Sequence, residues 1–292
     1  MINFALYAVT VAIWGSTWLV ITFQLKDAAV TTGVGWRFVL ASLMLLVWCG
    51  LRRVSLSFTP RQYVLILVQG LANFSFNYWM VYLAETRIPS GLVAVIFTLL
   101  LVFNMIGGRI FFAQPIGWRG GLGAAFGMVG VLLVFWPEVS RFGAGSQAWQ
   151  GLAFALAGTF FSSIGNLMSV QTQKAGIGVI PTITIGMGAG GAAMMAASLL
   201  TGQSLSVPLD AGFLSALIYL SLFGSVIAFA AYLTLIGRVG AGPASYNGVL
   251  IPIVALALST LYEGYQWQVA SIAGVVLSLL GNVLVMQGKA RS

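Results

Sequence analysis

Apolar residues occupy this chain in long continuous runs, interrupted by short stretches that contain proline, glycine or charged residues. A helix needs about 20 predominantly apolar residues to cross roughly 30 Å of hydrocarbon, and ten runs reach about that length. The runs lie near residues 3–23, 31–51, 62–84, 89–112, 119–136, 150–173, 179–201, 212–236, 242–262 and 268–287. The pattern therefore predicts an all-α integral membrane protein with ten transmembrane helices.

The two halves of the chain resemble each other at a separation of about 150 residues. Matching positions are Phe4-Ala5-Leu6 with Phe154-Ala155-Leu156, and Gly91, Gly123 and Gly130 with Gly242, Gly274 and Gly281. The longest connection separates the halves, so we expect five-helix repeats over residues 1–140 and 141–292 within one membrane domain. Because five is an odd number, the second repeat must be inverted. Inverted repeats place a site at their interface near the midplane and permit alternating access, which favours a transporter.

All acidic residues lie in alternate connections between the runs, and basic residues crowd the other connections. The acids are Asp27, Glu85, Glu138, Asp210 and Glu263. The acid-free connections hold Arg52, Arg53, Arg61, Arg109, Arg119, Lys174, Arg238, Lys289 and Arg291. Because positive charge is retained on the cytoplasmic side, we expect a multi-pass inner (plasma) membrane protein with cytoplasmic N- and C-termini. The net charge of +8 then faces anionic lipid headgroups, and we expect no nucleic-acid partner.

The composition, 60% hydrophobic and 6% charged residues, excludes a water-soluble surface and removes most catalytic chemistry. With no histidine and one cysteine, Cys49, neither a metal centre nor a nucleophile with its base is readily assembled. We therefore expect no enzyme activity, no metal and no cofactor, and the repeats disfavour a channel. Proton relays usually use buried Asp, Glu or His. Because Glu85 and Glu263 are the only candidates, at helix ends, we expect a facilitator or exchanger driven by the solute gradient.

Polar side chains recur at helical spacing inside several runs, as Asn73 and Asn77 do in the third. Such groups usually face the bundle or a wet cavity, so we expect them to line a central site. The substrate-binding candidates are Trp14, Thr17, Asn73, Asn77, Tyr78, Tyr82, Phe97, Ser163, Asn166, Ser225, Tyr232, Ser245 and Tyr246. The alternative is that the polar groups only join neighbouring helices, each for roughly 0.6 to 2 kcal/mol, and that the rings only pack.

A cavity lined by amides, hydroxyls and aromatic rings suits zwitterions or amphipathic organic solutes, because rings attract ammonium groups and amides orient polar ends. Phosphorylated metabolites would instead demand clusters of Lys or Arg. We therefore predict export of aromatic or other neutral amino acids. The alternative is a broad-specificity exporter of drugs or quaternary cations. The expected partners are a small-molecule substrate and membrane lipids, with the protein as a monomer or weak homodimer.

One charge, Arg37, lies inside an apolar run, roughly 9 Å deep at 1.5 Å per residue. Its guanidinium either snorkels to the membrane surface or faces the bundle, where it contacts helix carbonyls or a substrate carboxylate. Pro252, inside the ninth run, removes a backbone hydrogen bond and kinks its helix. With Gly248 nearby it is a candidate hinge for access switching, and a purely structural kink is the alternative.

Four short motifs occur at widely spaced positions. They are Trp14-Gly15-Ser16-Thr17-Trp18, Trp36-Arg37-Phe38, Leu250-Ile251-Pro252 and Glu263-Gly264. They resemble signatures of the drug/metabolite transporter (DMT) superfamily, EamA branch, over the whole chain. The resemblance implies a ten-span exporter and is strongest to the YddG-type exporters of aromatic amino acids. The first repeat departs from the pattern, because Phe112 occupies the position matching Glu263, so no role of that glutamate is implied there.

Overall fold

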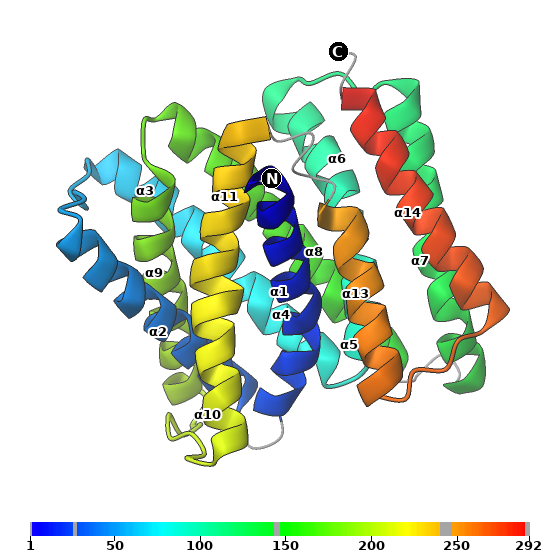
Figure 1. Ribbon diagram of the computed structural model, residues 1–292, viewed down its shortest axis with the longest axis horizontal. Coiled ribbons are helices and arrows are strands. Elements are labelled where there is room, and N and C mark those ends of the chain that lie inside the picture. The colour runs from blue at the N-terminus through cyan, green and yellow to red at the C-terminus, as the bar shows by residue number, and fades with distance from the viewer. Residues whose placement is uncertain (1, 26–27, 143–146, 240–246, 290–292) are drawn as a thin grey trace.

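The computed structural model describes residues 2–25, 28–142, 147–239 and 247–289, and these residues form a bundle of helices (Figure 1). The helices are α1 (Ile2–Gln24), α2 (Val30–Leu51), α3 (Pro60–Leu71), η1 (Ala72–Phe76), α4 (Asn77–Glu85), α5 (Ser90–Ile96), η2 (Phe97–Leu99), α6 (Leu100–Phe112), α7 (Trp118–Phe142), α8 (Gln147–Lys174), α9 (Val179–Leu200), α10 (Ala211–Ile218), η3 (Tyr219–Ile227), α11 (Ala228–Val239), α13 (Asn247–Tyr262) and α14 (Val269–Lys289).

Ten apolar spans are present within the described ranges, as the sequence predicts. Eight are long and apolar enough to cross a membrane by length and composition, and two shorter apolar helices, α13 and α14, complete the set. The third span consists of α3, η1 and α4, the fourth of α5, η2 and α6, and the eighth of α10, η3 and α11. In Figure 1 the start of α1 and the end of α14 lie toward the same end of the bundle.

The helix boundaries follow from local chemistry. Thr59 and Gln62 form a capping box before Pro60, in which the Thr59 side chain accepts from the Gln62 N–H at 3.3 Å. Asp210 caps the start of the eighth span, and its side chain accepts from the Phe213 N–H at 3.0 Å. The seventh span ends before Gly202, whose φ of +72° is a left-handed conformation that favours glycine.

Glycines bring α7 and α14 into backbone contact and reveal the symmetry of the repeats. A methyl group added at Gly123 would lie 2.5 Å from the carbonyl oxygen of Gly281, and one at Gly130 would lie 2.6 Å from that of Gly274. The order of these contacts makes the helices antiparallel. In the 151-residue repeat, Gly123 corresponds to Gly274 and Gly130 to Gly281. The symmetry of the repeats therefore turns the contact of Gly123 with Gly281 into the contact of Gly274 with Gly130. Such an isologous, antiparallel contact requires a two-fold axis perpendicular to the helices, as inverted repeats have.

Other contacts between helices show the same symmetry: when each span is replaced by the span five places away in the chain, one contacting pair becomes another contacting pair. Spans three and six touch through α4 and α8, as spans eight and one do through α11 and α1. Span three also packs on α9, as span eight packs on α2 through η3. The predicted two inverted five-helix repeats are thereby confirmed. We keep their division near residue 140 as a proposal, with α7 ending at Phe142 and α8 beginning at Gln147.

A π-helical segment interrupts both the third and the eighth span. Shifted by 151 residues, η1 covers residues 223–227, which lie within η3 at 219–227. Wider π turns inside α-helices occur frequently at functional sites. Their recurrence at one place in both repeats marks the centre of these two spans as the region to inspect.

We expect the Gly130→Ala variant to be less stable than the parent protein. The added methyl group would clash with the Gly274 carbonyl, and overpacking of this kind costs about 1–3 kcal/mol. Thermal unfolding in detergent micelles measures the effect. Gly121→Ala in the same helix is the control, because no atom lies within 4 Å of the added methyl group. Equal unfolding temperatures for both variants would contradict the close contact.

Candidate substrate site at the repeat interface

Aromatic rings from both repeats meet in the interior beside the π-helical segments. Trp14 of α1 packs against Phe229 and Tyr232 of α11, each with ring centroids 5.1 Å apart. Phe229 meets Phe74 of η1 edge-on at 5.6 Å. These separations are typical of favourable edge-to-face pairs. A ligand ring would therefore find aromatic faces and edges from both repeats at this place.

The row of rings continues through α2 to a buried cation. Phe74 lies 5.3 Å from Phe38, and Phe38 lies 4.8 Å from Tyr78, between ring centroids. The Arg37 guanidinium is 4.4 Å from the centre of the Tyr78 ring, a distance at which a cation is attracted to the ring face. We call the six rings and this guanidinium the aromatic row. It consists of Tyr232, Trp14, Phe229, Phe74, Phe38, Tyr78 and Arg37.

Arg37 lies in the bundle, and its exposed fraction is 0%. Its Nε donates to the Ser225 hydroxyl at 3.3 Å, and its backbone carbonyl accepts from the Ser221 hydroxyl at 3.0 Å. Nη1 is buried and has no hydrogen-bond partner. The structure therefore places this residue in the interior rather than at a membrane surface. Both serines belong to η3, so the eighth span positions Arg37, which lies on the second span.

Gly224 lets the first and second spans approach the eighth together. Its carbonyl accepts from the Trp14 indole N–H at 3.1 Å. A methyl group added at Gly224 would lie 2.8 Å from the Thr17 methyl and 3.3 Å from Arg37 Nη2. The Thr17 hydroxyl donates to its own helix, to the Trp14 carbonyl at 2.9 Å. Thr17 consequently contributes close packing here, and its hydroxyl is already engaged.

The amides form a second polar group between the third and sixth spans. Asn73 packs directly on Gly165 of α8, the neighbour of Asn166 in the chain, because glycine leaves room for its side chain. Asn77 Nδ2 donates to the Asn73 carbonyl at 3.2 Å, whereas its Oδ1 is buried without a partner. Ser163 is buried on the same α8. These side chains can offer a ligand neutral donors and acceptors.

Phe97 lies apart from the aromatic row and pairs with Trp18 at 5.1 Å. Tyr82 borders the row at Arg37, and its hydroxyl donates to Gln24 Oε1 at 2.7 Å. Ser245 and Tyr246 lie outside the described residues. The candidates that the structure joins in the row are Trp14, Tyr78 and Tyr232, with Ser225 attached through Arg37.

Two carboxylates lie at the end of the bundle where α4 and α13 finish, and we call this the acidic end. Glu263 accepts from the backbone N–H of Ser90 at 3.1 Å and from its hydroxyl at 2.6 Å, at the start of α5. Glu85 is 9% exposed, and neither of its oxygens has a hydrogen-bond partner. The sequence places Glu85 correctly at a helix end, but the structure buries it.

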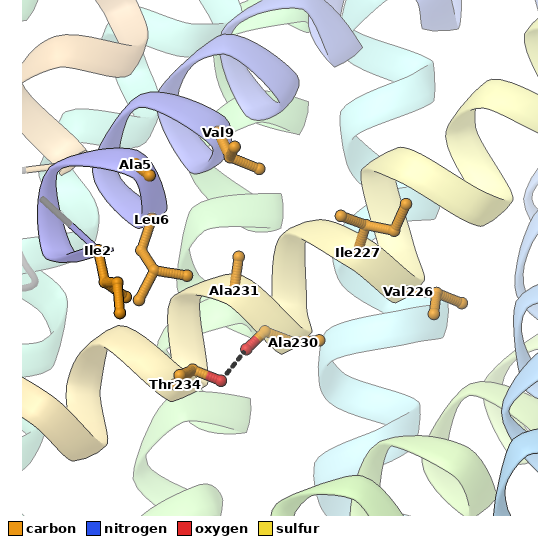
Figure 2. Close-up of a pocket in the computed structure, with 9 residues that line it drawn as sticks. All are labelled: Ile2, Ala5, Leu6, Val9, Val226, Ile227, Ala230, Ala231 and Thr234. Carbon is orange, nitrogen blue, oxygen red and sulfur yellow. Dashed lines mark hydrogen bonds between the residues drawn. The ribbon is translucent and has the colours of Figure 1, made fainter.

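An open groove of about 480 Å³ lies between α1 and the eighth span, away from these polar groups (Figure 2). Eight of its nine lining residues are apolar, and the hydroxyl of the ninth, Thr234, donates to the Ala230 carbonyl of its own helix at 2.8 Å. The groove therefore offers a ligand apolar contact alone. That property suits a lipid chain better than a polar solute.

The candidate hinge lies in α13. Pro252 is buried within this helix and has no N–H to donate to the carbonyl of Gly248, four residues earlier. No atom outside its helix lies within 4 Å of a methyl group added at Gly248. The turn of α13 from Gly248 to Pro252 therefore lacks a backbone hydrogen bond and is loosely packed at Gly248. We keep the hinge as a proposal.

The profile of the EamA-like transporter family matches the chain twice, over residues 2–136 and 149–287. The chain belongs to this family. The two matches also correspond to the two repeats. As an EamA-like transporter it has ten described spans and a polar, aromatic centre, and the expected membership of the DMT superfamily is confirmed.

Curated relatives share the full extent of the fold. The "Uncharacterized inner membrane transporter YedA" of Escherichia coli K12 is 30% identical over 96% of this chain and 90% of its own. A "Probable amino-acid metabolite efflux pump" from the same organism is 24% identical over 95% and 90%. A solved crystal structure with 15% identity has a TM-score of 0.72 and covers 99% of both chains. That structural likeness supports the fold of this EamA-like transporter.

Some residues of the site were missed by the sequence reasoning. Phe38, Phe74 and Phe229 belong to the aromatic row, but 19 phenylalanines give no individual signal. One clue was available, because the 151-residue shift that matches the glycines also matches Tyr78 to Phe229. The burial of Glu85 could not be predicted from the sequence, because its apolar run ends just before it.

Removing the Ser225 hydroxyl should destabilise the protein. The Ser225→Ala variant leaves the buried Arg37 guanidinium without its acceptor at 3.3 Å, and an unsatisfied buried polar group costs about 1–3 kcal/mol or more. Thermal unfolding in micelles is the measurement, with Ser215→Ala, an exposed serine of the same span, as the control. If the two variants unfolded at the same temperature, the described support of Arg37 would be wrong.

Proposed function

We propose that the chain exports small amphipathic organic solutes, namely aromatic or other neutral amino acids, by alternating access at the repeat interface. The observation that carries the proposal is the aromatic row, in which rings from both repeats meet beside the two π-helical segments. Aromatic side chains of a cargo can stack edge-to-face with Trp14 and Phe229. The amides of Asn73 and Asn77, which neighbour Phe74 and Tyr78 of the row in the chain, can supply neutral polar contacts, and we also expect Asn166 to take part.

The charge of the centre supports amino acids over phosphorylated solutes. Arg37 is the one buried cation among the described residues, whereas phosphate recognition favours several Arg or Lys groups. Export is supported by the efflux activity named for a relative. We also propose a location in the inner membrane with both termini cytoplasmic, supported by the charge pattern and by the relative YedA.

Alternating access fits the way the two ends of the bundle are built. At the acidic end, the Glu263 carboxylate joins the ninth span to the start of α5, which is buried throughout. No such carboxylate exists at the equivalent position of the other repeat, where Phe112 stands. We propose that movement at Gly248 and Pro252 opens one end as the other closes, in a monomer or weak homodimer. We retain a gradient-driven facilitator or exchanger without enzymatic activity as the mode of action.

Export of drugs or quaternary cations is a second candidate, and Glu85 favours it. A buried carboxylate near aromatic rings attracts organic cations. The sequence reasoning set this function second because no internal acid was visible. Competition for transport between an amino acid and a quaternary ammonium compound distinguishes the two candidates.

Counterflow in proteoliposomes tests the proposed function. We expect labelled phenylalanine to exchange against internal unlabelled phenylalanine in a saturable manner. Trp14→Ala should lower the uptake by about tenfold or more, because a Trp ring at the centre of a binding site is often worth 2 kcal/mol or more. Trp118→Ala is the matched control, since that ring is 73% exposed and lies outside the row.

Three results would count against the proposal. They are absence of amino-acid counterflow in wild-type vesicles, preference for sugar phosphates, and equal losses in the Trp14 and Trp118 variants. Displacement of phenylalanine by tetraphenylphosphonium at far lower concentration than by other amino acids would favour the cation exporter instead.

A further inference from the structure

Two opposite charges, Arg37 on α2 and Glu85 at the end of α4, are buried on helices that contact each other, and neither is fully paired. Arg37 is 0% exposed with Nη1 lacking a partner. Glu85 is 9% exposed with both carboxylate oxygens lacking one. Isolated charges are costly to bury, and they normally pair with each other or with a ligand. Each of these two groups therefore has unused capacity for a charged partner.

Glu85 shares one stripe of the third span with the two tyrosines that contact Arg37. Tyr78, Tyr82 and Glu85 follow at i, i+4 and i+7, so they share one face of the helix. The guanidinium lies over the Tyr78 ring at 4.4 Å and also interacts with the Tyr82 hydroxyl. Glu85 lies one turn farther along, about 4.5 Å at 1.5 Å per residue. No hydrogen bond joins Arg37 to Glu85, because both Glu85 oxygens lack a partner.

The neighbouring polar groups do not supply the missing partners of Arg37 and Glu85. Glu263 carries the same charge as Glu85 and repels it, and the Glu263 carboxylate accepts hydrogen bonds from Ser90. Gln24 Oε1 accepts from Tyr82, whereas its Nε2 is buried and free to donate. The site thus contains a free cationic donor, a free neutral donor and a free carboxylate, and its two charges sum to zero.

An α-amino acid has the complementary head group, with a carboxylate and an ammonium on one carbon and no net charge. We propose that Arg37 and Glu85 together bind the head group of a zwitterionic α-amino acid, with the carboxylate on Arg37 and the ammonium on Glu85. The cargo side chain then extends along Tyr78 and Phe38 into the aromatic row. This inference rests on the proposed function and assigns the recognition of its substrate class to two residues.

Three ligands that share one ring test the two charges separately. Phenylalanine has both charged groups, phenethylamine has only the ammonium, and 3-phenylpropionate has only the carboxylate. Binding to purified full-length protein is measured for each, together with counterflow in vesicles. We expect wild-type protein to bind phenylalanine at least about tenfold more tightly than either analogue, because each lost charge contact is worth more than 1.4 kcal/mol.

The single variants should lose affinity selectively. Arg37→Gln should weaken phenylalanine and 3-phenylpropionate by about tenfold or more and spare phenethylamine. Glu85→Gln should weaken phenylalanine and phenethylamine and spare 3-phenylpropionate. The double variant Arg37→Gln/Glu85→Gln removes both buried charges together, which keeps the site neutral, and it should bind the three ligands alike. Asp210→Asn is the matched control, because it removes an exposed carboxylate at the start of α10 while Asn can still cap that helix, and it should not change the order of the three ligands.

Equal losses for all three ligands in both single variants, with the double variant regaining wild-type affinity, would overturn the inference. That result would assign Arg37 and Glu85 to an ion pair that closes the acidic end. In that case phenylalanine binding by wild-type protein and its loss in Trp14→Ala would leave the proposed function standing. Wild-type protein that binds none of the three ligands would overturn both.

Discussion

Hydrocarbon offers no hydrogen bonds, and this constraint organises the molecule from its backbone to its candidate site. Every polar group within a span must find its partner inside the protein. Serines and threonines meet the requirement largely on their own helices, as the Thr17 hydroxyl does. The charged groups of Arg37 and Glu85 make no such bond to their own helices, and both lie in the interior. The same constraint that makes each span a helix therefore keeps the charged side chains of the spans inside the bundle.

The repeats are symmetric in backbone and unequal in side chains. Gly123 and Gly130 exchange places with Gly274 and Gly281, so the contact of α7 with α14 is nearly self-complementary. Arg37 has no such counterpart, because a shift of 150 residues matches it to Met187. A symmetric backbone is thus combined with a buried cation in only one of the two repeats. Under the proposed function, a solute would meet this cation beside rings that come from both repeats.

The sequence predicts the spans and repeats well because both depend on the length and spacing of apolar runs. It predicts the site less completely, because run length says nothing of how a helix is rotated. Arg37 could face lipid or bundle on sequence grounds, and only its contacts with Ser225 and Tyr78 decide between them. Phe74 was inconspicuous among many phenylalanines for the same reason. Glu85 ends its helix as expected, yet the packing of neighbouring spans buries it.

The π-helical segments are places where the spans that carry the candidate site could bend. In each repeat a wide turn interrupts the span that carries part of the site, Asn73 and Phe74 in η1 and Ser221 with Ser225 in η3. Wider turns replace the regular ladder of α-helical hydrogen bonds, so they are places where a helix can change direction at modest cost. Because η3 holds Arg37 through two serine hydroxyls, a bend in the eighth span would move the guanidinium together with the rings. Binding and bending would then act on the same few residues, which is the coupling that alternating access requires.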